Sequence, residues 1–277
     1  MNRRQFLIGS TGLVASSGIA GYLEGRIRLA VKYHMINEPT LTVVDKFALL
    51  REIGFDGTEL KTDEKVDHTE IERAIGETGI PVHGIVNAGK QEIIPALELA
   101  HRLKCESVLS FAQTQPDLSY EENFAFWQDL VRKALPTAEQ HGIPICIENV
   151  RASFLDQAEE MARFIDSLDS PMVKSYFDLG NTITWSEQPA EDWARILGKR
   201  VQKLDIKDRG HPEFGEAKLK REGVVGSNEG EVHWERVRTL LEGNEFSGWA
   251  TAEVPGGDRT RLARMKAWME DVLDLNG

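Results

Sequence analysis

The sequence has few cysteines and no excess of positive charge, and each shortage excludes a class of protein. Two cysteines among 277 residues, Cys105 and Cys146, cannot form a disulfide framework. Both lie in apolar, strand-like segments, so we expect buried free thiols. The net charge is −12, and no basic stripe is present. Because binding to a nucleic-acid backbone depends on clustered Lys and Arg, we expect no nucleic-acid partner.

Long apolar runs, heptad repeats and low-complexity tracts are also missing. A membrane-spanning helix needs about 20 apolar residues, so no stable membrane span is expected. The composition, 41% hydrophobic and 28% charged, is that of a globular protein, and the length allows one large core. No shift in composition marks a domain boundary, and nothing in the sequence decides between a monomer and a homo-oligomer.

The first 25 residues resemble a twin-arginine export signal. Arg3 and Arg4 precede a short apolar run that is broken by Gly and Ser. Such a signal is an address read by a receptor rather than an anchor. We therefore predict export to the periplasm, with the folded domain at residues 26–277; the chain would stay in the cytoplasm if the signal were not used.

After this segment, eight short apolar runs alternate with segments of helical spacing. The runs show little polar alternation, as expected of strands that are buried on both faces. They are residues 28–33, 57–61, 81–86, 106–111, 143–148, 173–178, 201–207 and 248–254. Amphipathic helices are expected at 42–54, 68–79 and 154–168. This order predicts a single-domain α/β fold, the (β/α)8 TIM barrel. An open doubly wound sheet is disfavoured because no Gly-rich phosphate motif follows the first strand.

Four consecutive predicted strands end in a carboxylate. Glu148, Asp178, Asp205 and Glu253 end or follow strands five to eight. In a TIM barrel these ends meet at one rim, where active sites lie. Four acids that converge there would repel one another, and a divalent cation would relieve the repulsion. Oxygen ligands alone suit a hard ion such as Mg²⁺ or Mn²⁺. Each acid by itself has an ordinary reading as an exposed or helix-capping residue.

Six motifs, in order along the chain, resemble the sugar phosphate isomerase/epimerase family of xylose isomerase-like TIM barrels. They are GFDGTEL (54–60), IPICIENV (143–150), YFDLGNTITW (176–185), KLDIKD (203–208), GSNEGEVHW (226–234) and GWATAEV (248–254). The resemblance implies a metal-dependent sugar isomerase or epimerase with one divalent ion, commonly Mn²⁺, with Mg²⁺ or Co²⁺ as alternatives. Its ligands would be Glu148, Asp178, Asp205 and Glu253. The two glutamates would also be the catalytic acid/base pair that moves a proton beside the sugar carbonyl.

The sequence departs from the family pattern at Asp205, where the family usually has His. Aspartate still suits a hard ion, and Lys207 would offset its charge. His211 is a less favoured substitute ligand, and Glu229 resembles a structural Gly-Glu-Gly turn.

Further residues at the same rim are predicted substrate contacts: His34, Glu59, His83, Asn181, Trp185 and Lys207. A lone strand histidine such as His83 is as often a hydrogen-bonded core residue. Asn181 resembles a family position that touches substrate hydroxyls. Trp185 would stack on a sugar face, although tryptophan in such a loop is as often simple packing.

Two other functions remain open, and a third is disfavoured. A keto-glycoside lyase or hydrolase would use the same metal and the same first proton abstraction. A non-catalytic sugar-binding barrel would follow if Asp205 abolished metal binding. An abasic-site endonuclease shares the fold but resembles a multi-zinc site, and the seven histidines of this acidic chain rarely fall at strand ends. The preferred substrate is a small sugar or keto-sugar without a phosphate, because phosphorylated sugars are largely kept in the cytoplasm.

Overall fold

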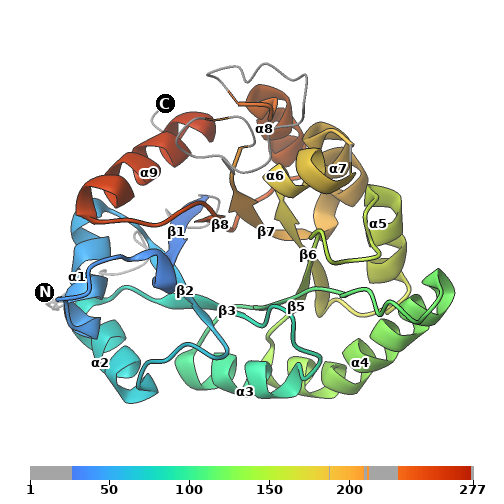
Figure 1. The fold of residues 1–277 in the computed structure, drawn as a ribbon, viewed down its shortest axis with the longest axis horizontal. Coiled ribbons are helices and arrows are strands. Elements are labelled where there is room, and N and C mark those ends of the chain that lie inside the picture. Colours follow the sequence, from blue (N-terminus) through green and yellow to red (C-terminus); the bar gives the residue numbers. More distant parts are fainter. Residues whose placement is uncertain (1–26, 187, 209–210, 212–229, 276–277) are drawn as a thin grey trace, which may run out of the picture.

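Eight parallel strands close into a barrel in chain order (Figure 1). The computed structural model describes residues 27–186, 188–208, 211 and 230–275. The strands are β1 (Arg28–Lys32), β2 (Gly57–Lys61), β3 (Val82–Val86), β4 (Val108–Ser110), β5 (Ile145–Glu148), β6 (Val173–Asp178), β7 (Val201–Ile206) and β8 (Trp249–Ala252). Each overlaps one of the eight predicted runs, and the predicted (β/α)8 TIM barrel is confirmed.

Helices surround the barrel as an outer ring (Figure 1). They are α1 (Val43–Ile53), α2 (His68–Thr78), α3 (Ile94–Leu103), α4 (Tyr120–His141), α5 (Ala158–Asp166), the short α6 (Leu179–Asn181), α7 (Ala190–Leu197), α8 (Trp234–Gly243) and α9 (Arg259–Val272). Three short turns add η1 (Tyr33–Met35), η2 (Thr182–Ser186) and η3 (Gly198–Arg200). None of the helices in the described ranges is long and apolar enough to cross a membrane. The predicted export signal at residues 1–25 lies outside the described residues.

Local sequence signals set the ends of α1. The Thr42 side chain accepts a hydrogen bond from the Asp45 amide, and the Asp45 carboxylate accepts one from the Thr42 amide, which forms a capping box. Gly54 ends the helix with a φ of 95°, in the left-handed region that glycine adopts without strain. The predicted bounds of this helix are therefore confirmed.

Helix α5 is shorter than the sequence predicts. It begins at Ala158 rather than near residue 154, because the backbone amide of Ala158 donates to the side chain of Gln188. Phe154 precedes the helix and packs edge-on against Phe164 and Tyr120. Its apolar spacing thus reflects burial in an aromatic cluster, and helical periodicity alone could not separate the two.

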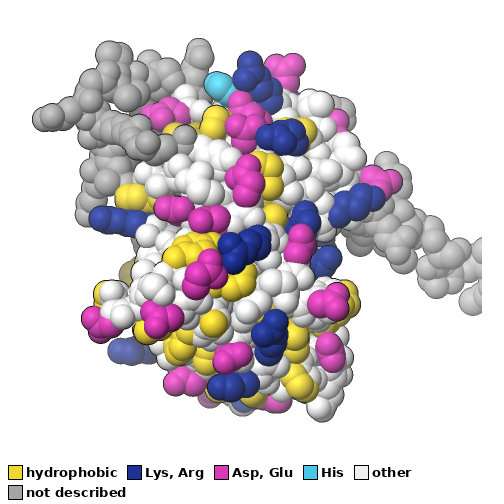
Figure 2. Space-filling view, turned by 90° about the vertical axis from the view of Figure 1, so that its right-hand side faces the viewer, with side chains coloured by type: hydrophobic (Ala, Val, Ile, Leu, Met, Phe, Trp, Pro, Cys, Tyr) yellow, Lys and Arg dark blue, Asp and Glu magenta, His cyan; other side chains and the backbone are white. Residues whose placement is uncertain are grey.

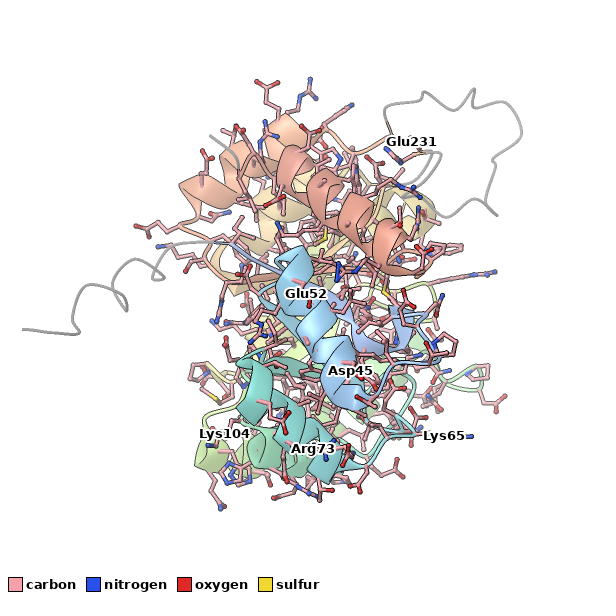
Figure 3. The ribbon with its side chains drawn as sticks, turned by 90° about the vertical axis from the view of Figure 1, so that its left-hand side faces the viewer. Asp45, Glu52, Lys65, Arg73, Lys104 and Glu231 are labelled. Carbon is pink, nitrogen blue, oxygen red and sulfur yellow. The ribbon has the colours of Figure 1, made fainter. Side chains whose placement is uncertain are left out.

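Burial follows the barrel pattern, with apolar side chains filling the space between strands and helices. Both cysteines, Cys105 and Cys146, are buried and form no disulfide, as predicted. Burial raises the pKa of each thiol to about 12. The outer helices also carry charged side chains on their solvent side: Asp45 and Glu52 on α1 and Arg73 on α2 point away from the barrel (Figure 3). Acidic and basic side chains are interspersed over the opposite side of the molecule (Figure 2).

A glycine after β8 lets the last loop pack against the first. A Cβ at Gly256 would lie 2.6 Å from Met35 Cα and 2.7 Å from its carbonyl carbon. Neither backbone atom can move alone, so we expect Gly256→Ala to destabilise the protein by about 2 kcal/mol or more. Gly76, exposed in α2, has nothing within 4 Å of such a Cβ. Gly76→Ala should therefore stabilise by about 0.5–1 kcal/mol. Urea unfolding measures both, and equal stabilities would contradict the close approach.

Candidate metal centre

The four predicted carboxylates meet at the carboxyl ends of the strands. Glu148 and Asp178 end β5 and β6, Asp205 lies in β7, and Glu253 follows β8. One oxygen from each lies within 4.8 Å of the others, a spacing at which a single cation could touch all four. Asp178 and Asp205 are fully buried and Glu148 is 5% exposed. The Glu253 side chain keeps 33% exposure and faces solvent.

Two lysines enter this cluster. The Lys32 ammonium, from the end of β1, donates to Asp205 Oδ2 at 3.0 Å and to Glu253 Oε1 at 2.8 Å. The Lys207 ammonium donates to Glu253 Oε2 at 3.0 Å and lies 2.9 Å from Asp178 Oδ2. Both lysines are at most 5% exposed. Sequence reasoning assigned the charge of Asp205 to Lys207 and missed Lys32, which the structure shows in contact with Asp205.

The donor set fits a divalent cation. When all six groups are ionised, four carboxylates and two ammonium groups leave two net negative charges, which one divalent ion would neutralise. Asp205 Oδ1 is buried and, among the described residues, has no hydrogen-bond partner, whereas Asp178 Oδ2 lies 2.9 Å from the Lys207 ammonium. Unsatisfied buried carboxylate oxygens are costly, and a cation would satisfy them. Such oxygens are the ligands that Mg²⁺ and Mn²⁺ prefer.

Without an ion, the cluster favours bound protons. Burial, together with the charge of Glu253, raises the pKa of Glu148 to about 7. Burial also raises the pKa of Asp178 and of Asp205 well above the ordinary range, although Lys207 and Lys32 oppose this. Burial acts in the same direction on Glu253, but the two ammonium groups hold its pKa well below the ordinary value.

Asparagine side chains hold the ends of β5 and β6 together. Asn149 donates to the Asp178 carbonyl and accepts from the Asp178 amide, both at 2.8 Å. Asn181, a predicted substrate contact, donates from its side chain to the Asn149 carbonyl at 2.8 Å. The Asn181 amide also donates to Asp178 Oδ1 at 2.9 Å. This network leaves Asp178 Oδ2 directed to the cluster. Asn181 thus holds Asp178, a candidate metal ligand, through a direct hydrogen bond to its carboxylate.

A pocket of about 100 Å³ is lined by residues that include Asn149, Asn181 and Trp185, and by none of the four carboxylates. The Trp185 indole donates to Asn181 Oδ1 at 3.0 Å, and the Arg151 guanidinium lies 4.8 Å from the Trp185 ring centre. Arg151 already covers this aromatic ring. A sugar would therefore have to share or displace that contact, and stacking on Trp185 stays a prediction.

Glu59 and His83, also predicted substrate contacts, lie inside the barrel at 1% exposure each. The Lys203 ammonium donates to the His83 carbonyl and lies 2.7 Å from His83 Nδ1. The Tyr176 hydroxyl lies 3.1 Å from Glu59 Oε1 and 3.0 Å from Thr251 Oγ1. Burial and the charge of Lys203 hold the pKa of His83 well below its usual range, so the ring is neutral. Contact with a substrate would require this network to open, and it stays a prediction.

The remaining predicted residues lie at the rim or outside the described ranges. His34, in η1, is exposed. Partial burial and the charges of Lys61 and Lys32 lower its pKa to about 4. The His211 ring lies 5.5 Å from that of Trp268, and the described cluster of ligand atoms does not include it. Glu229 lies outside the described residues.

Asp208 shapes this rim and had no role in the sequence-based prediction. Its carboxylate accepts hydrogen bonds from the Glu231 and Val232 amides at 2.7 and 3.1 Å and from the Trp234 indole at 2.8 Å. Asp208 therefore connects the end of β7 to the start of α8.

The signal for Lys32 was present in the sequence: a lysine ends the otherwise apolar first strand, at the same rim as the acids.

Comparison with known proteins gives one family match and several similar solved structures. The family model for xylose isomerase-like TIM barrels matches residues 47–273. No curated protein sequence matches the chain. Among solved structures, the apo form of 3-keto-D-glucoside 4-epimerase from E. coli is similar, with a TM-score of 0.69 and 16% identity over 87% of this chain and 100% of that one.

Two other similar structures have a TM-score of 0.72 and 14% identity. D-psicose 3-epimerase in the presence of D-fructose is covered over 99% of its chain, and the IOLI protein with a bound zinc atom over 98%; each match covers 89% of this chain. At these identities the likeness shows the fold. The family match spans most of the sequence, and the chain belongs to the xylose isomerase-like TIM barrel family.

Proposed function

We propose that this protein is a sugar isomerase or epimerase that depends on a divalent metal ion, with Mn²⁺ as the preferred ion. The observation that carries the proposal is the buried four-carboxylate cluster at the catalytic rim of the barrel. Membership of the xylose isomerase-like family and the similarity to solved sugar epimerases support it.

We propose different chemical roles for the two glutamates. A divalent ion, when bound, would polarise a sugar carbonyl and make the neighbouring C–H more acidic. Burial raises the pKa of Glu148, and among the described residues no hydrogen bond or ion pair joins it to an ammonium group, so Glu148 is the stronger base of the two and is suited to take up the proton. Glu253 has both oxygens on lysine ammonium groups and a lower pKa, so its carboxylate stays ionised and returns a proton less readily.

The lysines also bear on the substrate class. Lys32 and Lys207 are buried and bound to carboxylates of the cluster, so neither ammonium group is turned outward toward a phosphate. We therefore propose a sugar or keto-sugar without a phosphate as the substrate, with hydroxyl and carbonyl oxygens as the groups that reach the centre.

Metal content and proton exchange test this function together. The purified chain should contain close to one equivalent of divalent metal by elemental analysis. In heavy water with Mn²⁺, it should place deuterium on the carbon beside the carbonyl of D-psicose, D-fructose or a 3-keto-D-glucoside, as NMR would show, and EDTA should abolish the exchange. Exchange accompanied by cleavage of the glycosidic bond would favour a lyase. A folded protein with neither metal nor exchange would exclude the proposed reaction.

A further inference from the structure

Lys32 links the first strand of the barrel to the last two. Its side chain is 5% exposed, and its ammonium donates to Asp205 in β7 and to Glu253 after β8. Lys32 and Asp205 are 173 positions apart in the chain. Only the closure of the barrel, where β1 pairs with β8 and β8 with β7, brings them together. A buried lysine in this position costs free energy unless its charge is used.

The two oxygens of Asp205 have different surroundings. Oδ2 accepts from Lys32 at 3.0 Å, whereas Oδ1 is buried with no hydrogen-bond partner among the described residues. Lys32 therefore fixes the rotation of the carboxylate and leaves Oδ1 as the oxygen available to a cation. The same ammonium fixes Oε1 of Glu253 at 2.8 Å, so one lysine orients two of the four acids.

Charge leads to the same assignment. An ionised aspartate and the ammonium group that it contacts together carry no net charge. With the Lys207 contacts included, the centre carries two net negative charges instead of four, when all groups are ionised. Four unpaired carboxylates would repel one another strongly at this burial. Lys32 thus lets a fourth carboxylate join the cluster with no excess of negative charge over one divalent ion.

We propose that Lys32 is a positioning residue of the cation centre, which orients Asp205 and offsets its charge so that the pair acts as a single neutral ligand. This inference rests on the proposed function, because it presupposes a divalent ion at the four carboxylates. The basis is the contact geometry of Lys32 and the unpartnered oxygen of Asp205.

The test measures Mn²⁺ affinity by isothermal titration calorimetry on the full chain after treatment with a chelator. The variants are Asp205→Asn, Lys32→Met and the double variant. Asp205→Asn alone removes a charged ligand and leaves the Lys32 charge beside the ion, so Mn²⁺ binding should weaken by about 100-fold. In the Lys32→Met background the same change should weaken binding by less than about tenfold, because the Asp205 carboxylate is then no longer held with Oδ1 turned toward the ion.

Lys203→Met is the matched control. Lys203 is as buried as Lys32 and also points into the barrel, but its described contacts are to His83. In its background the full loss from Asp205→Asn should remain. Circular dichroism checks the fold of each variant, and Lys32→Gln, which keeps a polar group of similar length, replaces Lys32→Met if the latter does not fold.

Each outcome decides one of the two proposals. A smaller loss in the Lys32 background alone supports the assignment. Two results would overturn the role of Lys32 and leave the metal centre standing. In the first, Asp205→Asn weakens Mn²⁺ binding equally in the wild type, in Lys32→Met and in Lys203→Met. In the second, Lys203→Met shrinks the effect of Asp205→Asn as much as Lys32→Met does. A folded wild-type chain that binds no Mn²⁺ would overturn the metal centre and the Lys32 assignment with it.

Discussion

Glu148→Gln is expected to lower the rate of proton exchange on a keto-sugar by about 10²–10⁴-fold. Glutamine keeps the shape of the side chain but can neither accept the proton nor supply a charged oxygen to a cation. Deuterium incorporation followed by NMR measures the rate. The conservative change Glu121→Gln, on the exposed surface of α4, should leave the rate unchanged.

The same substitution should raise the stability of the ion-free protein. Burial raises the pKa of Glu148 to about 7, above its ordinary value of 4.5. A carboxyl group whose folded pKa is raised destabilises the folded state above that pKa, and this penalty is absent below pH 4.5. At pH 8 in EDTA, the glutamine variant should therefore melt at a higher temperature than the wild type. A variant that is inactive because it melts lower would contradict this account, and a fully active variant would remove Glu148 from the mechanism.

Mn²⁺ is expected to raise the melting temperature by roughly 8–16 °C when its concentration is about a thousandfold above the dissociation constant. Binding to the folded state alone contributes about 4 kcal/mol under that condition. For a chain of this size, each kcal/mol corresponds to about 2–4 °C. Part of the binding free energy would come from Asp205 Oδ1, which is buried and has no hydrogen-bond partner among the described residues.

This gain should be larger at pH 8.5 than at pH 7. In the ion-free centre the pKa values of Glu148, Asp178 and Asp205 are raised, so protons occupy part of the site near neutral pH. Metal binding must release these protons, and its affinity therefore increases as the pH rises. Other titrating groups, such as the neutral His83, affect both samples alike and cancel in the difference.

Thermal unfolding with EDTA or Mn²⁺ at the two pH values measures the gain. Asp178→Asn, which removes one ligand but keeps the side chain volume, should lose most of it at both pH values. If Mn²⁺ leaves the melting temperature unchanged at both pH values, or raises it equally in the wild type and in Asp178→Asn, the cluster does not bind the ion.

Much of the candidate centre was predictable because its carboxylates follow strands. The βα repeat places each strand end at the same rim, so Glu148 and Asp178 could be placed from their positions after two apolar runs. The partners of these acids could not be predicted in the same way. A contact such as that between Lys32 and Asp205 depends on barrel closure and on side-chain rotamers, neither of which has a local sequence signal.

The surroundings of two predicted substrate contacts, Glu59 and His83, show what position along a strand leaves open. Glu59 was placed near the end of β2 and is the third of its five residues, with its carboxylate buried beside the Tyr176 hydroxyl. His83 and Lys203 meet there from strands 120 positions apart. The sequence shows three ionisable residues in apolar strands, and their mutual contact depends on how the barrel is packed.

The sequence by itself determined the fold class, the order of the strands, the helix caps and the convergence of four acids at one rim, because all of these follow from local periodicity and a regular repeat. The tertiary structure alone decided the electrostatics of that rim. Two buried ammonium groups reduce the charge of four carboxylates, and one lysine from the first strand orients the aspartate in β7. Charge balance in a buried site depends on distances of about 3 Å between residues far apart in the chain, which only the closed barrel brings together.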